Sequence, residues 1–254
     1  ADNVLDGAAL TGQVLNFNNG GGVVQLAGFD ITTATGITFS AVVGAFDSNT
    51  DANAIISDNI TTSNAVISFR NSAGAGNTIT LSGTNSAITS GTIIVDMANT
   101  GSLIIGGANS AGASNANVTL DVNQGTLDLN ASIGLQNIEL AAATILGNTA
   151  NTVTATGAVE LLGNATLSSG ASLTLSGVVS EVGGARTITK LGAGTVVLSG
   201  TNTFTGGVTL TAGTLQANTN AAALGAAAGA VAIGAGGTLD FAGDYDGNKT
   251  STTV

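Results

Sequence analysis

Short runs of alternating apolar and polar residues, separated by Gly or Asn, make up most of this chain. The stretch from Lys190 to Ala217, KLGAGTVVLSGTNTFTGGVTLTAGTLQA, shows the pattern most clearly, with a break every five to eight positions. A period of two indicates strands with one buried face, and such frequent breaks leave no room for a long helix. The run from Asn220 to Ala230 tolerates a single helical turn, with Asn220 as its N-cap and Gly225 as its end.

Sequence motifs recur along the chain at long and regular intervals. TITLSGTN, which ends at Asn85, reappears as TVVLSGTN, which ends at Asn202. GSLII at Gly101 returns as GTLDL at Gly125, and GTLQA at Gly213 returns after the same interval as GTLDF at Gly237. A fixed period in the twenties is typical of solenoid proteins.

Leucine-rich repeats and β-helices share this period, but no register of the chain fits the L-x-x-L-x-L-x-x-N frame of a leucine-rich repeat. The sequence therefore predicts an all-β fold, a right-handed parallel β-helix (β-solenoid), since parallel crossovers are right-handed. We expect about 11 coils of roughly 20–24 residues, stacked ~4.8 Å apart.

The composition fits a narrow core of stacked aliphatic side chains. Hydrophobic residues make up 43% of the chain, but aromatic residues only 3%, and there is no Pro to interrupt hydrogen bonding between coils. Val, Ile, Leu and Ala fill the inward columns, and Thr, Ser and Asn suit the outward positions. We expect the following residues to point into the core: Val197, Leu210, Leu215, Leu239 and Phe241.

The regularity of the pattern changes along the chain. Residues 1–76 are less regular and are expected to form capping or wider coils, because solenoid ends are atypical. Five of the seven Phe residues lie there: Phe17, Phe29, Phe39, Phe46 and Phe69. Residues 77–254 are expected to continue the same solenoid in regular coils and to stop inside another repeat.

The stretch from Lys190 to Ala217 resembles the strand repeat of bacterial autotransporter passengers, K-x-G-x-G-T-L-x-L-S-G-x-N-T-[YF]-T-G-G-T-x-[IVL]-x-x-G-T-L. The resemblance is specific over Gly177 to Gly243. It implies a right-handed parallel β-helix that is exported by the type V route and displayed outside the outer membrane. The residues that define the repeat motif are Gly194, Leu198, Gly200, Asn202, Phe204, Gly206, Gly207, Gly213, Leu215, Gly237 and Leu239.

The charge balance argues against several partners. Fifteen acidic residues against four basic ones give a net charge of -11. Nucleic acid is excluded because phosphate binding depends on clustered Lys and Arg, which the chain lacks. No apolar run reaches the length of about 18 residues that a membrane helix needs, so we expect no membrane insertion by this segment.

The chain contains no His and no Cys, which excludes serine and cysteine catalytic triads as well as disulfides and thiolate metal sites. Two groups of carboxylates remain, one formed by Asp47, Asp51 and Asp58, and the other by Asp240, Asp244 and Asp246. We interpret both groups as solvated turn residues and predict that the protein is not an enzyme.

One weak metal motif is present. Asp244, Asp246 and Asn248 match the start of a calcium loop, but Lys249 stands where that loop needs Gly. We interpret the segment as an Asx-rich turn and expect no cofactor, with calcium as the one weak candidate.

These observations favour an extracellular structural or adhesive protein, a rigid passenger segment of an autotransporter-like adhesin at the Gram-negative cell surface. Its ligand would lie on a host cell, another bacterium or a surface. The main alternative is a self-assembling filament or surface-layer subunit, whose copies associate end to end or side by side. A polysaccharide-active β-helix enzyme is a minor alternative, because a fold does not fix a function.

Overall fold

The computed structural model describes residues 3–4, 15–18, 22–26, 31, 37–40, 43–48, 53–57, 59–63, 65–72, 76–85, 88–107, 110–112, 116–218, 220–226, 229–242 and 251–253. These residues form a parallel β-solenoid and contain no helix. The predicted fold class is confirmed, while the number of turns differs slightly from the 11 expected. The chain divides into two compact units, residues 1–128 and 129–254.

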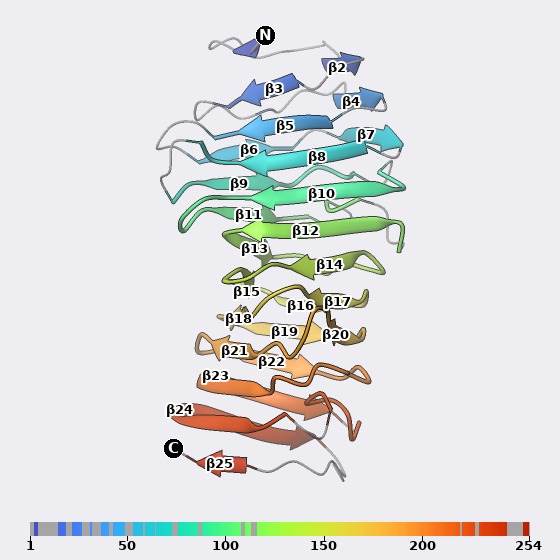
Figure 1. The fold of residues 1–254 in the computed structure, drawn as a ribbon. Coiled ribbons are helices and arrows are strands. Elements are labelled where there is room, and N and C mark those ends of the chain that lie inside the picture. Colours follow the sequence, from blue (N-terminus) through green and yellow to red (C-terminus); the bar gives the residue numbers. More distant parts are fainter. Residues whose placement is uncertain are drawn as a thin grey trace. The chain divides into compact units, whose positions relative to one another are not determined.

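In unit 1 every strand pairing that the structure describes is parallel, and Figure 1 shows the strands of successive turns lying side by side. The first sheet contains β1 (Asn3–Val4), β3 (Gly22–Gln25), β5 (Val43–Asp47), β8 (Ala65–Arg70), β10 (Gly91–Asp96) and β12 (Val118–Gln124). The second contains β6 (Ala54–Ile56), β9 (Thr78–Leu81) and β11 (Ser102–Ile105), and the third β2 (Leu15–Asn18), β4 (Ile37–Ser40) and β7 (Ile60–Ser63). β13 (Thr126–Leu129) spans the boundary between the units.

The turns of unit 1 lengthen along the chain. Gly22 pairs with Gly44 in the next turn, whereas the later pairing of Gly91 with Val118 spans a longer stretch of sequence. The later turns of unit 1 are therefore longer than the sequence repeat predicts.

Unit 2 also consists of parallel ladders. Its first sheet contains β14 (Asn137–Leu140), β17 (Val159–Leu161) and β20 (Val179–Glu181). A second ladder contains β15 (Ile145–Asn148), β18 (Ala165–Ser169) and β21 (Ile188–Leu191), and a third β16 (Thr152–Ala155), β19 (Ser172–Leu175) and β22 (Thr195–Leu198). The long strand β23 (Val208–Asn218) pairs with β21 and with β22, and β24 (Val231–Ala242) and β25 (Ser251–Thr253) follow.

In unit 2 Leu210 and Leu215 are fully buried in inward columns, as predicted, and Leu239 is half-buried. Val197 is 9% exposed, but it pairs with Thr174 and Gln216 in an outward column, so its predicted inward direction is wrong. Phe241 is 45% exposed, so its predicted core position is wrong. β25 pairs only with Val231 to Ile233, and among the described residues no strand lies over the second half of β24.

Aromatic side chains are part of the unit 1 core. Phe46 and Phe69 occupy the same register position in β5 and β8, are fully buried and stack with their ring centroids 5.3 Å apart. Phe17 on β2 and Phe39 on β4 are register partners in the backbone pairing of these strands. Phe29 lies outside the described residues.

The segment that tolerates a helical turn forms a turn over residues 221–224. Asn220 Oδ1 accepts a hydrogen bond from the Ala222 N–H at 2.9 Å, and Gly225 ends the turn with a φ of +79°. Within the ranges described, the chain has no helix with the length and apolar character needed to cross a membrane.

Candidate functional site

The candidate site is the repeat segment at residues 188–217, which contains β21, β22 and most of β23. Its most unusual side chain is Lys190, which occupies an inward column between Leu167 and Leu210 and is fully buried. Lysine is rarely buried without a partner. The Lys190 Nζ donates to three backbone carbonyl oxygens, those of Leu191 at 2.6 Å, Gly192 at 2.8 Å and Ala212 at 3.2 Å.

This carbonyl cage ties two neighbouring turns of unit 2 together, since Ala212 belongs to the turn after Lys190. Burial lowers the pKa of the Lys190 ammonium below its ordinary value of 10.5. The set of motif residues chosen from the sequence omitted Lys190. Its position at the start of the repeat pattern, two residues before the Gly-x-Gly turn at Gly192, is the signal that could have identified it.

We predict that Lys190 makes the stability of the chain depend on pH in the alkaline range. Between the lowered folded-state pKa and 10.5 the unfolded chain binds more protons than the folded chain, so stability rises with pH. Lys190→Met removes the titrating group and should flatten this rise. Urea unfolding of both proteins up to about pH 10.5 measures the effect. A stability difference between them that does not change with pH would contradict the prediction.

Asn202 connects three successive turns of unit 2. Its side chain is 2% exposed. Oδ1 accepts a hydrogen bond from the Val179 N–H at 2.7 Å in the preceding turn, and Nδ2 donates to the Ala223 carbonyl oxygen at 2.6 Å in the following turn. Both Oδ1 and Nδ2 of Asn202 therefore bind backbone groups of neighbouring turns. Without the Asn202 side chain these buried groups would lack a hydrogen-bond partner.

Asn85 makes the same contacts in unit 1. It is fully buried, accepts a hydrogen bond from the Ile60 N–H at 2.7 Å and donates to the Ser110 carbonyl oxygen at 2.7 Å. The two asparagines end the two copies of the LSGTN motif. The repeat found in the sequence thus marks a repeated clamp between turns.

The other motif residues shape the chain around these side chains. Leu198, Phe204 and Leu215 are fully buried. Gly213 bends β23 with a φ of +69°, where a Cβ would collide with the Gly192 carbonyl oxygen. The remaining predicted positions lie in turns or in β24: Gly194, Gly200, Gly206, Gly207, Gly237 and Leu239.

Glu181 forms hydrogen bonds with the loop that leads into the repeat segment and with a turn within that segment. Its carboxylate accepts hydrogen bonds from the Arg186 N–H at 2.6 Å, the Thr205 N–H at 2.9 Å and the Thr205 hydroxyl. Desolvation opposes ionisation, but these hydrogen bonds and one from the Gly206 N–H together lower the pKa of Glu181 below 4.5. Glu181 therefore contributes stability above that pH, which is lost as the pH falls through the lowered pKa.

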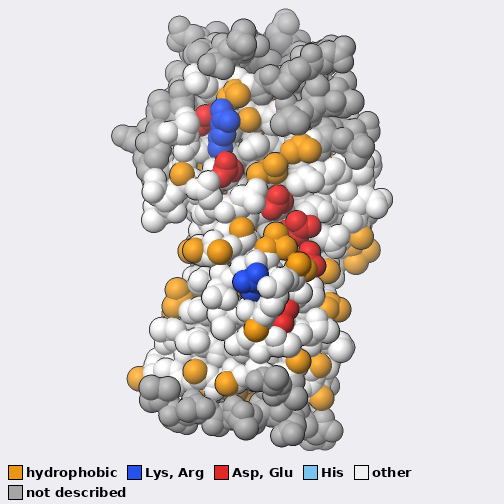
Figure 2. Space-filling model, viewed as in Figure 1, with side chains coloured by type: hydrophobic (Ala, Val, Ile, Leu, Met, Phe, Trp, Pro, Cys, Tyr) orange, Lys and Arg blue, Asp and Glu red, His pale blue; other side chains and the backbone are white. Residues whose placement is uncertain are grey.

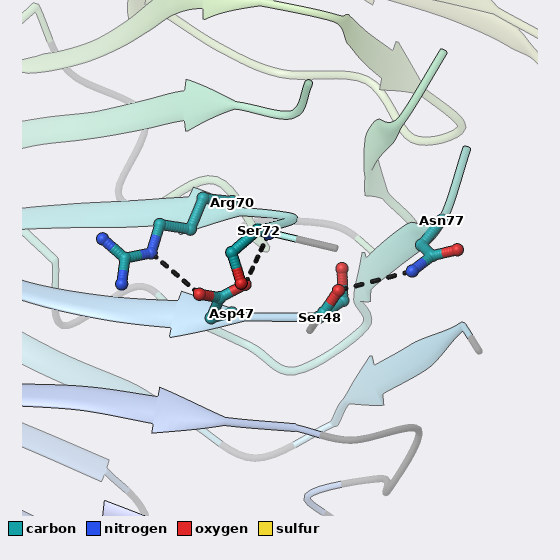
Figure 3. A network of polar contacts seen from close by, with 5 residues as sticks. All are labelled: Asp47, Ser48, Arg70, Ser72 and Asn77. Carbon is teal, nitrogen blue, oxygen red and sulfur yellow. Dashed lines mark hydrogen bonds and ion pairs between the residues drawn. The ribbon is translucent and has the colours of Figure 1, made fainter. Parts of the chain in front are cut away.

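The two groups of Asp residues named in the sequence analysis do not form a catalytic pair among the described residues. Asp47 is 1% exposed, forms an ion pair with Arg70 at 3.1 Å and accepts the Ser72 N–H at 2.8 Å (Figure 3). In the same network Asn77 Nδ2 donates to the Ser48 carbonyl oxygen at 3.3 Å, so the network joins β5 to the turns that follow. Asp47 is therefore a buried residue at the end of β5 with a structural role, and its interpretation as a solvated turn residue is wrong.

The other candidate carboxylates give no cluster in the described part of the chain. Asp240 is exposed and accepts a hydrogen bond from Gln216 Nε2 at 2.7 Å. Asp51 and Asp58, and the calcium candidates Asp244, Asp246 and Asn248, lie outside the described residues. The described residues contain no group of three or more His, Cys, Asp or Glu side chains that could hold a metal ion.

Comparison with known proteins gives a family match for this segment. Residues 188–217 match the family model of the passenger-associated transport repeat. No curated protein and no solved structure shows significant similarity to the chain. The resemblance found in the sequence is confirmed: this segment matches a passenger-associated transport repeat, and it forms part of a parallel β-solenoid.

Proposed function

We propose that this chain is an extracellular structural and adhesive segment, part of the passenger of an autotransporter-like protein at the surface of a Gram-negative bacterium. The passenger repeat at residues 188–217 carries the proposal. Lys190 and Asn202 fix the turns of this segment through buried hydrogen bonds, so the solenoid offers rigid outward faces for attachment. The role is structural rather than enzymatic, and its ligand would lie on a host cell, another bacterium or a surface.

The test uses the protein in the bacterium that produces it. An epitope tag placed in this chain should be labelled by antibody on intact cells, with a cytoplasmic protein as the unlabelled control. The purified chain, added in excess, should reduce attachment of these cells to cultured epithelial cells or to polystyrene. An epitope that becomes accessible only after permeabilisation would overturn the surface location, and unchanged attachment would overturn the adhesive role.

A further inference from the structure

The asparagine side chains of this chain use their amide groups in two different ways. Five described asparagines are buried, and each donates a hydrogen bond from Nδ2 to a backbone carbonyl oxygen: Asn71, Asn77, Asn85, Asn148 and Asn202. Other asparagines are exposed and accept a backbone N–H of the following turn through Oδ1. Asn59 accepts the Thr84 N–H and Asn164 accepts the Thr187 N–H, both at 3.0 Å.

The nitrogen of these exposed amides has no role in the described fold. In the part of the chain that the structure describes, no hydrogen bond joins Nδ2 of Asn59 or Asn164 to an acceptor. An amide nitrogen lies opposite the amide oxygen, and here the oxygen is fixed by the next turn. Because both side chains are exposed, Nδ2 is left available to solvent.

The sequence around these two asparagines has a further common feature. Both begin an Asn-x-Thr triplet, Asn59-Ile60-Thr61 and Asn164-Ala165-Thr166. Asn59 directly precedes β7 and Asn164 directly precedes β18, so strand alternation buries the middle residue and places the Thr on the outer side with the Asn. Asn-x-Ser/Thr, with any residue except Pro in the middle, is the acceptor triplet of N-linked glycosylation.

The triplet is missing at positions where the fold uses Nδ2. Each of the five buried asparagines has Ser or Thr as its next residue, but Ala, Ile or Phe stands at the position that the triplet requires. Three further asparagines donate from Nδ2 and do not begin the triplet: Asn123, Asn151 and Asn220. An amide nitrogen that is needed for the fold is therefore not placed in an acceptor triplet at these eight positions.

Two other triplets lie among the described residues, at Asn117 and Asn130. Asn130 is half-buried, and the hydroxyl of Ser132 in its triplet already accepts the Thr154 N–H at 3.0 Å. We limit the proposal to Asn59 and Asn164, because their amides are held in the same way in the two units.

We propose that Asn59 and Asn164 are sites of N-linked glycosylation, modified by a glycosyltransferase of the producing bacterium. Nδ2 attacks the anomeric carbon of a sugar that is activated by a diphosphate group. The bond between Nδ2 and this carbon forms, Nδ2 loses one proton, and the diphosphate leaves with the electron pair of the broken C–O bond. The product keeps Oδ1 and its hydrogen bond to the next turn, so the fold accepts the sugar without losing a contact.

The surface of the chain gives such a modification a physical effect. Charged residues make up only 7% of the chain, and Figure 2 shows few charged side chains among the uncharged polar groups of the face drawn. Glycans are bulky and hydrated, so they would raise the solubility of a surface with so few charges. This inference goes beyond the proposed adhesive role and does not depend on it.

Peptide mass spectrometry of the chain purified from the bacterium that produces it tests the proposal. Peptides containing Asn59 and Asn164 should carry the mass of one sugar, if the donor is a nucleotide sugar, or of an oligosaccharide, if the donor is a lipid-linked one. Asn53 is the matched control, since it is exposed and its Oδ1 accepts the Thr78 N–H at 2.9 Å, but Ile55 stands in place of the Thr. Unmodified Asn59 and Asn164, or equal modification of Asn53, would overturn the proposal.

Variants of the triplet show whether its hydroxyl directs the modification. Thr61→Ala should abolish it at Asn59, and Thr166→Ala should abolish it at Asn164, whereas Thr166→Ser keeps the hydroxyl and should retain it. These outward substitutions leave both asparagines and their Oδ1 hydrogen bonds in place, so the chain should still fold. A sugar that persists on Asn164 in Thr166→Ala would contradict the proposal. Surface labelling of cells tests the proposed location independently of this result.

Discussion

Replacing Leu215 with Asp is expected to unfold the turns of unit 2 next to β23. Leu215 is fully buried and lies in register between Val196 and Leu239. These register partners offer a carboxylate no positive charge, and burying it should cost roughly 4 kcal/mol or more. Turns of a solenoid are stabilised mainly by their neighbours, so the damage should spread to adjacent turns.

Urea unfolding followed by circular dichroism measures this loss, with Leu191→Asp as the matched control. Leu191 is 36% exposed, so the same substitution there should change the free energy of unfolding by less than about 1 kcal/mol. A Leu215→Asp variant as stable as the parent chain would show that the inward register assigned to β23 is wrong.

The second large effect is expected for Asn202→Ala. This substitution removes two hydrogen bonds and leaves the Val179 N–H and the Ala223 carbonyl oxygen buried without their partner. Such a change should lower the free energy of unfolding by about 3 kcal/mol. Asn85→Ala should produce a similar loss, because Asn85 makes the equivalent contacts.

Asn151→Ala is the control for both asparagine variants. Asn151 is exposed, and its Nδ2 donates to the Asn130 carbonyl oxygen at 2.7 Å, a bond that water can replace. Asn151→Ala should lower the free energy of unfolding by less than about 1 kcal/mol. If Asn202→Ala and Asn151→Ala had equal effects in urea, the clamp would contribute nothing beyond an ordinary surface hydrogen bond.

The strand pattern and the repeated LSGTN motif could be predicted from the sequence because both follow from a local period of two and from exact repetition. The repeat also pointed to Asn202, which occupies the position of Asn85. Local patterns could not predict that a charged side chain points into the core. Lys190 is buried because three carbonyl oxygens converge on its ammonium group, a property of the folded turns rather than of the sequence around it.

Phe241 is the opposite case, an apolar side chain that the sequence predicts to be buried and that is exposed. It pairs in register with Ala217, which is fully buried, so Phe241 lies in an inward column although its side chain is exposed. Burial of an inward residue in a solenoid also requires the next turn above it, and the described strand β25 covers only the first part of β24. The alternation of residues predicts the direction of a side chain, whereas its burial depends on the neighbouring turns of the solenoid.

Disulfide trapping in the repeat segment tests the parallel solenoid most directly, because the natural chain contains no Cys. Thr195 and Thr214 are register partners on β22 and β23, and Cα atoms on neighbouring strands are about 4.8 Å apart, within disulfide range. Thr195 and Gln216 are diagonal neighbours, whose Cα atoms are about 8 Å apart. We predict that Thr195→Cys with Thr214→Cys forms a disulfide in the native chain, while Thr195→Cys with Gln216→Cys does not. Faster oxidation of the diagonal pair, or none in the register pair, would contradict the fold proposed for this passenger repeat.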